Sequence, residues 1–208
     1  MQLVTSIASP AVVGDCDVLL CAGFVDKQYG LGMLYKRLNP RLCIPPAVID
    51  ELAKHRRSNN GHLRGSAEKI LGRRAVFINR IEDNSQLNAR RAVRREIELA
   101  EERLAKSRGR DYRPKPYGHS GEIQGILAAH NAGGIFLSND RAALFVAHSR
   151  GIPIATYPTL LAAEIRDGAL LAEDASQVCS SIVDIGWSCG VSDFSALRLT
   201  ELIVPDGI

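Results

Sequence analysis

The sequence predicts an α/β fold, a three-layer sandwich in which a parallel sheet carries helices on both faces. Short apolar runs rich in β-branched residues alternate with longer amphipathic segments, and Gly or Pro residues separate them. Strand and helix alternate regularly over residues 133–166, which is typical of a parallel sheet because each crossover to the next strand carries a helix. With 46% hydrophobic and 24% charged residues, the composition excludes disordered and collagen-like chains.

The first half of the chain is predicted to hold three strands. Residues 11–15 form a β-branched run that ends in a carboxylate, and the apolar segment that begins with residues 18–22 predicts a helix after it. Residues 41–44 predict the second strand, and the two prolines at 45–46 fix φ for the start of the next helix. Apolar residues return at 75–78, which we predict as the third strand.

The second half is predicted to begin with a long helix. Asn84 or Ser85 supplies its cap, it runs to about Ser107, and a loop rich in Pro, Gly and Arg at residues 108–118 ends it. Glycines then mark the turns between shorter elements. These elements are, in order, a helix over 120–130, a strand over 135–137, a helix over 141–149, a strand over 152–155 and a helix over 158–166.

Charge is unevenly distributed along the chain, which we predict to be a single domain of residues 1–208. The net charge is +3, but residues 54–115 hold 18 Lys and Arg against 8 Asp and Glu, a local balance of +10, so the rest carries −7. This block predicts a basic, largely helical insertion at residues 56–117 that contacts nucleic acid. Residues 172–208 are predicted to form a C-terminal covering segment.

Several classes of protein and site are not indicated by the sequence. No stretch predicts a membrane span or a signal peptide, and the expected location is the cytoplasm. The five cysteines form no CxxC pair, so we interpret them as small buried apolar residues rather than as disulfide or zinc ligands. No histidine spacing resembles a zinc site, and His119 is predicted as a surface or loop residue, with phosphate contact as the alternative.

Four acidic residues occupy comparable places in the predicted fold. Asp15 follows the first strand, Glu51 lies in the helix after the second, Glu122 lies at a helix start, and Asp140 follows a later strand. The carboxyl ends of parallel strands open at one edge of the sheet, so these groups are expected to converge there. Carboxylates held close together repel unless a cation neutralises them, and their hard oxygens select Mg²⁺ or Mn²⁺.

The segments that carry these acids resemble the PIN-domain nucleases in four successive motifs. The motifs are Val13-Gly-Asp15-Cys-Asp-Val-Leu-Leu20, Ile44-Pro-Pro-Ala-Val-Ile-Asp-Glu51-Leu52, Gly121-Glu122-Ile-Gln and Leu137-Ser138-Asn-Asp140-Arg-Ala-Ala143. Gly151-Ile-Pro-Ile-Ala155 and the helix after it also fit. The resemblance covers residues 11–55 and 118–166, and the order of the four motifs along the chain makes it specific.

The resemblance implies a site and a reaction. Asp15, Glu51, Glu122 and Asp140 match the quartet that coordinates one or two Mg²⁺ or Mn²⁺ ions in that family, and Ser138 matches its supporting hydroxyl residue. The implied reaction is hydrolysis of RNA phosphodiester bonds by metal-activated water, which leaves 5′-phosphate and 3′-hydroxyl ends. Residue 17 is Asp where the family more often has Asn or Ser, and it either adds a fifth carboxylate or caps the following helix.

The basic block is predicted to bind RNA, since arginine suits phosphate recognition. The residues expected to make these contacts are Arg56, Arg57, Arg73, Arg74, Arg90, Arg91, Arg94, Arg95, Arg113 and Lys115. Two alternatives remain open: a solvated helix supported by its own ion pairs, and a protein interface through the apolar stripe at residues 93, 97, 100 and 104. That interface would serve a homodimer or an inhibitory, antitoxin-like partner, although core packing of the stripe is favoured.

The sequence therefore predicts a metal-dependent endoribonuclease, with RNA as partner and Mg²⁺ or Mn²⁺ as cofactor. The alternative from another class is a non-catalytic PIN-like domain that binds RNA or a protein partner. Within the nucleases, a toxin and an RNA-processing enzyme both remain open, although the insertion is longer than in the compact toxins of the family.

Overall fold

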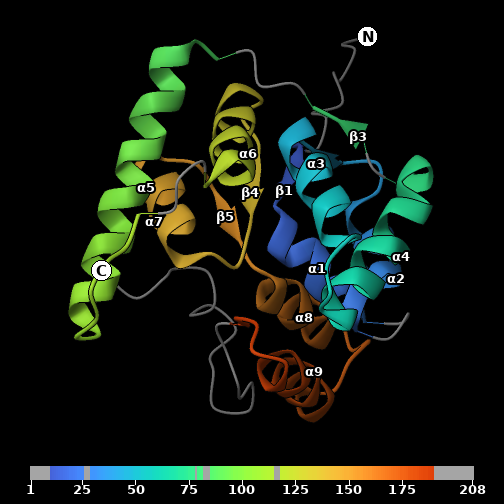
Figure 1. Ribbon diagram of the computed structural model, residues 1–208. Helices are drawn as coiled ribbons and strands as arrows, with labels where there is room; N and C mark the ends of the chain where they lie inside the picture. The colour runs from blue at the N-terminus through green and yellow to red at the C-terminus, as the bar shows by residue number, and fades with distance from the viewer. Residues whose placement is uncertain (1–9, 26–28, 78, 82–84, 115–117, 190–208) are drawn as a thin grey trace, which may run out of the picture.

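A five-stranded sheet, parallel throughout, forms the centre of the computed structural model (Figure 1). The structure describes residues 10–25, 29–77, 79–81, 85–114 and 118–189. Of residues 74–77 and 79 it describes the backbone only. The strands are β1 (Val12–Gly14), β2 (Leu42–Ile44), β3 (Asn79–Arg80), β4 (Ile135–Leu137) and β5 (Ile154–Ala155). Their order across the sheet is β3-β2-β1-β4-β5. The predicted α/β class with a parallel sheet is confirmed.

Helices connect the strands and cover both faces of the sheet. They are α1 (Cys16–Phe24), α2 (Leu31–Leu38), α3 (Pro46–His55), α4 (Gly61–Phe77), α5 (Leu87–Ser107), α6 (Ser120–Asn131), α7 (Arg141–Ser149), α8 (Tyr157–Arg166) and α9 (Ala172–Asp184). Figure 1 shows α5, α6 and α7 grouped on one side of the strands, and α1, α3 and α4 on the other. Within the described residues, no helix is long and apolar enough to cross a membrane.

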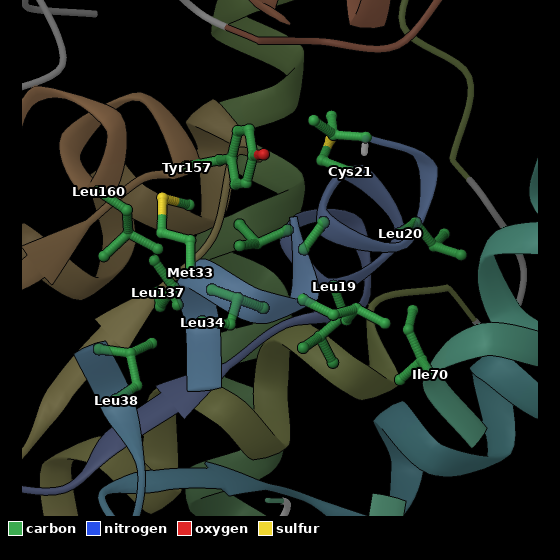
Figure 2. Packing of buried hydrophobic residues seen from close by; sticks show 14 of the residues in the cluster. Leu19, Leu20, Cys21, Met33, Leu34, Leu38, Ile70, Leu137, Tyr157 and Leu160 are labelled. Atoms are coloured by element: carbon green, nitrogen blue, oxygen red, sulfur yellow. The ribbon is translucent and has the colours of Figure 1, made fainter. Parts of the chain in front are cut away.

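Alternating side chains of the strands divide the core into two clusters, one on each face. Val12 and Leu137 belong to the cluster formed with α1, α2, α4 and α8, whereas Val13 and Phe136 pack with α5, α6 and α7. This division follows from the two-residue period of a strand, which turns successive side chains to opposite faces. Figure 2 shows part of the first cluster, with Leu160 and Leu34 next to Leu137 on one side of the view and Ile70 beyond Leu19 on the other.

Residues 75–78 were predicted as the third strand, and this prediction is wrong for residues 75–77. They form the last turn of α4, and the third strand is β3, which begins at Asn79; residue 78 lies outside the described part. A short apolar run does not distinguish a strand from a helix end by its periodicity. The helix continues here because α4 begins at Gly61 and packs along α1 through Ala67 and Ile70.

The basic block of residues 56–117 packs into the body of the protein. Within it, α4 covers α1, β3 pairs with β2, and α5 lies against α6 and α7. The predicted stripe of α5 faces inward, since Val93, Ile97 and Ala100 are buried and Leu104 is partly buried. Arg150 at the end of α7 donates two hydrogen bonds of 2.8 Å to the Glu96 carboxylate of α5. Core packing of the stripe is confirmed, so it is not available to a dimer partner.

The described part of the C-terminal segment is α9 and the residues up to Cys189. Helix α9 packs against α8 and buries Ala175, Cys179 and Ile182 in the first cluster. The remainder of the predicted covering segment, residues 190–208, lies outside the described residues.

Candidate metal centre

The centre lies where the direction of the chain across the sheet changes. From β1 the chain continues to β2 and β3 on one side, and only then crosses to β4 and β5 on the other. The connections from the carboxyl ends of β1 and β4 therefore diverge, and ligands of open α/β sheets commonly bind at such a position. The residues directly after these two strands, Asp15 and Ser138, lie side by side there because Gly14 is in register with Leu137.

Asp15 is fixed by backbone and side-chain hydrogen bonds. It is the N-cap of α1, and its Oδ1 accepts a 2.7 Å hydrogen bond from the Cys16 backbone N–H. Its Oδ2 accepts a 3.0 Å hydrogen bond from Ser138 Oγ. Only 3% of Asp15 and none of Ser138 is exposed. The carboxylate therefore has one position, set by the end of β1 and by the hydroxyl after β4.

The loop after β4 connects three acidic residues. The Asp140 backbone N–H donates to Ser138 Oγ at 3.0 Å, and the Asn139 backbone N–H donates to Asp17 Oδ2 at 2.8 Å. Asp17 Oδ1 also accepts from the Val18 N–H at 2.6 Å. Asp140 caps α7 through its Oδ1, which accepts from the Ala143 N–H at 2.8 Å. Asp15, Asp17 and Asp140 are thus brought together, with Ser138 in the supporting position that was predicted.

The side chain of Asn139 fixes this loop through hydrogen bonds, and Asn139 was not among the residues predicted from the sequence. Its side chain is buried; its Oδ1 accepts from the Tyr157 N–H at 3.0 Å, and its Nδ2 donates to the Ser188 carbonyl at 3.4 Å. The loop is thereby attached to α8 and to the segment after α9. The only signal in the sequence is a polar residue between two predicted site residues, Ser138 and Asp140.

Glu51 and Glu122 complete the acidic group from α3 and α6. A Cβ on Gly121 would stand 2.9 Å from Glu51 Oε2 and 3.3 Å from Asp15 Oδ1. Both carboxylates therefore reach the same point on α6, and only a residue without a side chain leaves them room there. Glu122 follows in the first turn of that helix. The structure brings all four acids of the predicted quartet to one edge of the sheet.

The electrostatics of the group are those of crowded, buried carboxylates. Burial, and after it the charges of Asp17, Glu122 and Glu51, raise the pKa of Asp15 well above its usual range. Burial and the charge of Asp140 raise the pKa of Asp17 to about 7. The pKa of Asp140 is also raised, by burial first and then by the charge of Glu122. A divalent cation would relieve this repulsion.

The donor set of the group is carboxylate oxygen, which fits Mg²⁺ or Mn²⁺. Its oxygens do not close on a single point: in the described part of the chain, three ligand atoms within 4.8 Å of one another occur only at Cys16, Glu51 and His55. An open arrangement suits Mg²⁺, which keeps several waters and is held through one or two carboxylates together with substrate phosphates.

His119 connects the acidic group to the long helix α5, which was not predicted. It is the residue before α6, has φ of +68°, and is 7% exposed rather than lying at the surface. Its Nε2 lies 3.2 Å from Glu101 Oε2 of α5, and its Nδ1 lies 3.7 Å from Glu122 Oε1. The positive φ and the packing on α5 are tertiary features that no motif in the sequence signals.

A cavity of about 470 Å³ opens beside Asp140. Asn139 and Asp140 line one side, α5 contributes Glu101 and Leu104, and the loop after α5 contributes its cationic side chains. These are Arg108, Arg110 and Arg113, with Arg141 of α7 and the ring of Tyr112 beside them. The basic loop thus borders the acidic group directly, and the volume is that of a small-molecule site.

The structure does not bring the other predicted RNA-binding residues into this cavity. Arg90, Arg91, Arg94 and Arg95 precede Glu101 on α5 by roughly 9–17 Å along the axis, at ~1.5 Å per residue. Arg56, Arg57 and Arg73 are exposed on and after α3 and on α4. The Arg74 side chain and Lys115 lie outside the described residues. Among the members of the predicted set whose side chains are described, only Arg113 lines the cavity.

Comparison with known proteins adds little. No protein-family model and no curated protein sequence matches the chain. Among solved structures, it is similar to a domain of a functionally unknown protein from Methanocaldococcus jannaschii, with 17% sequence identity and a TM-score of 0.42. The match covers 71% of this chain and 91% of that domain. A similarity of this size carries no argument about function.

Proposed function

We propose that the protein is a metal-dependent endoribonuclease whose centre is the acidic group at the carboxyl edge of the sheet. One observation carries the proposal: five carboxylates from four segments lie at one edge of the sheet, and burial together with their mutual repulsion raises the pKa of Asp15, Asp17 and Asp140. Such a group favours binding of a divalent cation, and its oxygen ligands favour Mg²⁺ or Mn²⁺. The resemblance of the four motifs to PIN-domain nucleases supports the same reaction.

The residues of the centre have distinct roles in this proposal. Asp15, Glu51, Glu122 and Asp140 hold the metal, and a bound ion supplies polarisation of the phosphodiester and a water of lowered pKa. Ser138 orients Asp15 by donating to its Oδ2. Asp17 accepts the Asn139 backbone N–H and so positions the loop that carries Asp140. Gly121 leaves the space in which Glu51 and Asp15 approach each other.

The substrate class follows from the charges around the centre. The cavity beside Asp140 presents guanidinium groups at Arg108, Arg110, Arg113 and Arg141, which suit phosphate oxygens. Tyr112 lies among them and offers a ring on which a base can stack. A second cavity of about 220 Å³, lined by Leu20, Leu63 and Trp187, has Asp17 at its edge. Polynucleotide bound across the acidic group would find phosphate contacts on one side and an apolar pocket on the other.

Cleavage of a circular single-stranded RNA, followed on a denaturing gel, tests the proposal. The purified protein should linearise the circle when Mg²⁺ or Mn²⁺ is added and not in excess EDTA, and the new ends should be 5′-phosphate and 3′-hydroxyl. Asp15→Asn should abolish the reaction. Asp50→Asn is the matched control, because Asp50 is an exposed carboxylate on α3 beside Glu51 and should not be needed. If the protein binds the circle without added metal and does not cleave it, the protein is a non-catalytic RNA-binding domain and not a nuclease.

Two arginine sets distinguish the RNA-contacting surfaces. Changing Arg110 and Arg113 together to Gln should weaken RNA binding strongly and reduce the slope of log K against log salt by about 0.7 per lost phosphate contact, as for a single strand. The set predicted from sequence on α5, Arg90, Arg91, Arg94 and Arg95, should have the smaller effect, because it lies farther from the centre. Equal affinities of wild type and both variants would assign the basic block to structure alone.

A further inference from the structure

We propose that Cys16, Glu51 and His55 form a second metal site, which binds a borderline-soft divalent ion such as Zn²⁺. Their ligand atoms, one sulfur, one carboxylate oxygen and one ring nitrogen, all lie within 4.8 Å of one another. Binding at this site does not depend on nuclease activity.

The local structure explains why these three side chains meet. Glu51 and His55 stand four residues apart on α3, so they share one helix face, and His55 Nε2 lies 3.8 Å from Glu51 Oε1. Cys16 is the first residue of α1 and follows Asp15, the residue at the carboxyl end of β1. Strands β1 and β2 are neighbours in the sheet, and the helices that follow them place the thiol beneath the Glu51–His55 pair.

The three ligands differ in burial, so the site is open to solvent on one side. Cys16 is 4% exposed, whereas the side chains of Glu51 and His55 are 39% and 28% exposed. An ion entering from solvent would meet the carboxylate and the imidazole first and the sulfur last. Three protein ligands with one side open to solvent is the arrangement of zinc sites that keep a water or substrate in the fourth position.

The chemistry of the donors selects a different ion from that of the acidic group. Thiolate and imidazole prefer Zn²⁺ to Mg²⁺, because Mg²⁺ takes oxygen ligands almost exclusively. The Cys16 thiol gives its proton to solvent as the sulfur–metal bond forms, so one proton is released for each ion bound through it. Burial, and after it the negative charges of Glu51 and Asp15, raise the pKa of the Cys16 thiol well above its usual range, so the metal must displace this proton; the same carboxylate charges attract a cation.

Glu51 belongs to both proposed metal sites, so Zn²⁺ bound at the second site is predicted to inhibit cleavage at the first. Glu51 approaches Asp15 with its Oε2 and His55 with its Oε1. Zn²⁺ held with Cys16 and His55 would compete for the Glu51 carboxylate and so inhibit cleavage that depends on Mg²⁺. This consequence, unlike the binding itself, rests on the proposed nuclease function.

Cobalt titration of the full chain tests the binding directly. Co²⁺ is a spectroscopic substitute for Zn²⁺, and a thiolate ligand gives a sulfur-to-cobalt charge-transfer band in the near ultraviolet. The band should appear at one equivalent, disappear when Zn²⁺ is added, and be missing in Cys16→Ser. Cys43→Ser should retain it, because Cys43 lies in β2 with its sulfur 3.4 Å from the Arg41 carbonyl. A band of equal strength in Cys16→Ser, or no band in the wild type, overturns the site.

His55→Ala provides a test that does not change the buried core. It should weaken Co²⁺ binding by more than the roughly 10- to 100-fold that loss of an outer-shell partner costs. His62→Ala is its control, since His62 is an exposed histidine on α4. Unchanged Co²⁺ affinity in His55→Ala would refute the ligand set.

The two proposals fail separately. A charge-transfer band in a protein that cleaves no RNA keeps the zinc site and refutes the nuclease. Cleavage by a protein that gives no band keeps the nuclease and refutes the zinc site. If both hold, micromolar Zn²⁺ should inhibit wild-type cleavage in excess Mg²⁺, and His55→Ala should be resistant to it. Equal inhibition of both proteins would refute the sharing of Glu51.

Discussion

Two glycines of α6 allow the geometry of the acidic centre to be tested separately from the packing of the core. Gly121 and Gly125 lie one turn apart, both buried. A Cβ at Gly121 would meet Glu51 Oε2 at 2.9 Å and Asp15 Oδ1 at 3.3 Å, whereas a Cβ at Gly125 would meet the Phe136 ring at 2.6 Å. The shortest contact at Gly121 is with the far end of a flexible, part-exposed side chain, and the buried Asp15 and Val48 lie at 3.3 Å, whereas the contact at Gly125 is with a ring that is fully buried. Alanine at the two positions should therefore have opposite consequences.

Gly121→Ala should leave stability nearly unchanged and reduce cleavage. Alanine is favoured over glycine by up to about 1 kcal/mol in a helix interior and by less at Gly121, the second residue of α6, so it partly offsets the small cost of moving the Glu51 carboxylate. The moved carboxylate no longer approaches Asp15 as before, and a displacement of about 1 Å at a catalytic centre can reduce the rate by about 100-fold, or about 2.7 kcal/mol. Gly125→Ala should instead lower the free energy of unfolding by about 1–3 kcal/mol, because the core must shift to admit the methyl group.

Two measurements on both variants test these expectations: urea unfolding for stability, and kcat/KM of Mg²⁺-dependent RNA cleavage for activity. We expect wild-type stability with low activity for Gly121→Ala, and low stability with near-wild-type activity below its unfolding transition for Gly125→Ala. Full activity in a stable Gly121→Ala would mean that the close approach of Glu51 to Asp15 is not needed for cleavage. The assignment of these two residues to one metal centre would then be wrong.

Three further predictions address the loop after β4 and the charge of the centre. Asp140→Asn should abolish cleavage without lowering the melting temperature, because Asn caps a helix about as well as Asp; a large fall in melting temperature would show that its role is structural. Asn139→Ala should reduce the free energy of unfolding by about 1–3 kcal/mol in a urea titration, since it leaves the buried Tyr157 N–H without its acceptor; a smaller loss would contradict that role. The pKa of Asp17 is raised to about 7, so the folded protein binds its proton more tightly than the unfolded chain; the stability of the metal-free protein should fall as pH rises from about 4 to about 7 and level off above. Asp17→Asn should reduce that fall in thermal melts across the interval, and an identical pH dependence in both proteins would contradict the raised pKa.

The parts of the fold that could be predicted from sequence are those whose partners are near in the chain. The strands at 12–14, 42–44 and 135–137 were predicted within one or two residues, because β-branched runs between Gly and Pro residues are a local signal. Helix α4 was missed, and residues 75–77 were assigned to a strand, because α4 has its apolar residues scattered around its circumference. Its position depends on packing against α1, which local periodicity does not encode.

The candidate site was also predictable only where its residues are placed by nearby parts of the chain. Asp15 and Asp140 follow strands, so the parallel sheet alone places them together. Cys16 was interpreted as a packing residue, because nothing local relates it to the distant Glu51. The contact between His119 and Glu101 likewise depends on the way α5 crosses α6 and α7. Sequence order signals which residues follow a strand, but not which side chains of distant helices meet.

Helix capping alone does not account for the charges of the acidic centre. Asp15 and Asp140 cap α1 and α7, and a cap stabilises a helix by about 0.5–2 kcal/mol, yet neutral Ser or Asn supplies that interaction about as well. The negative charge is therefore not needed for the caps, and in this buried group it is unfavourable, since burial and repulsion raise the pKa of both carboxyl groups. Glu51 extends toward the same crowded point at Gly121 without capping any helix there. An arrangement that costs stability in the metal-free protein, and that a divalent ion would reverse, is better explained by metal binding than by folding.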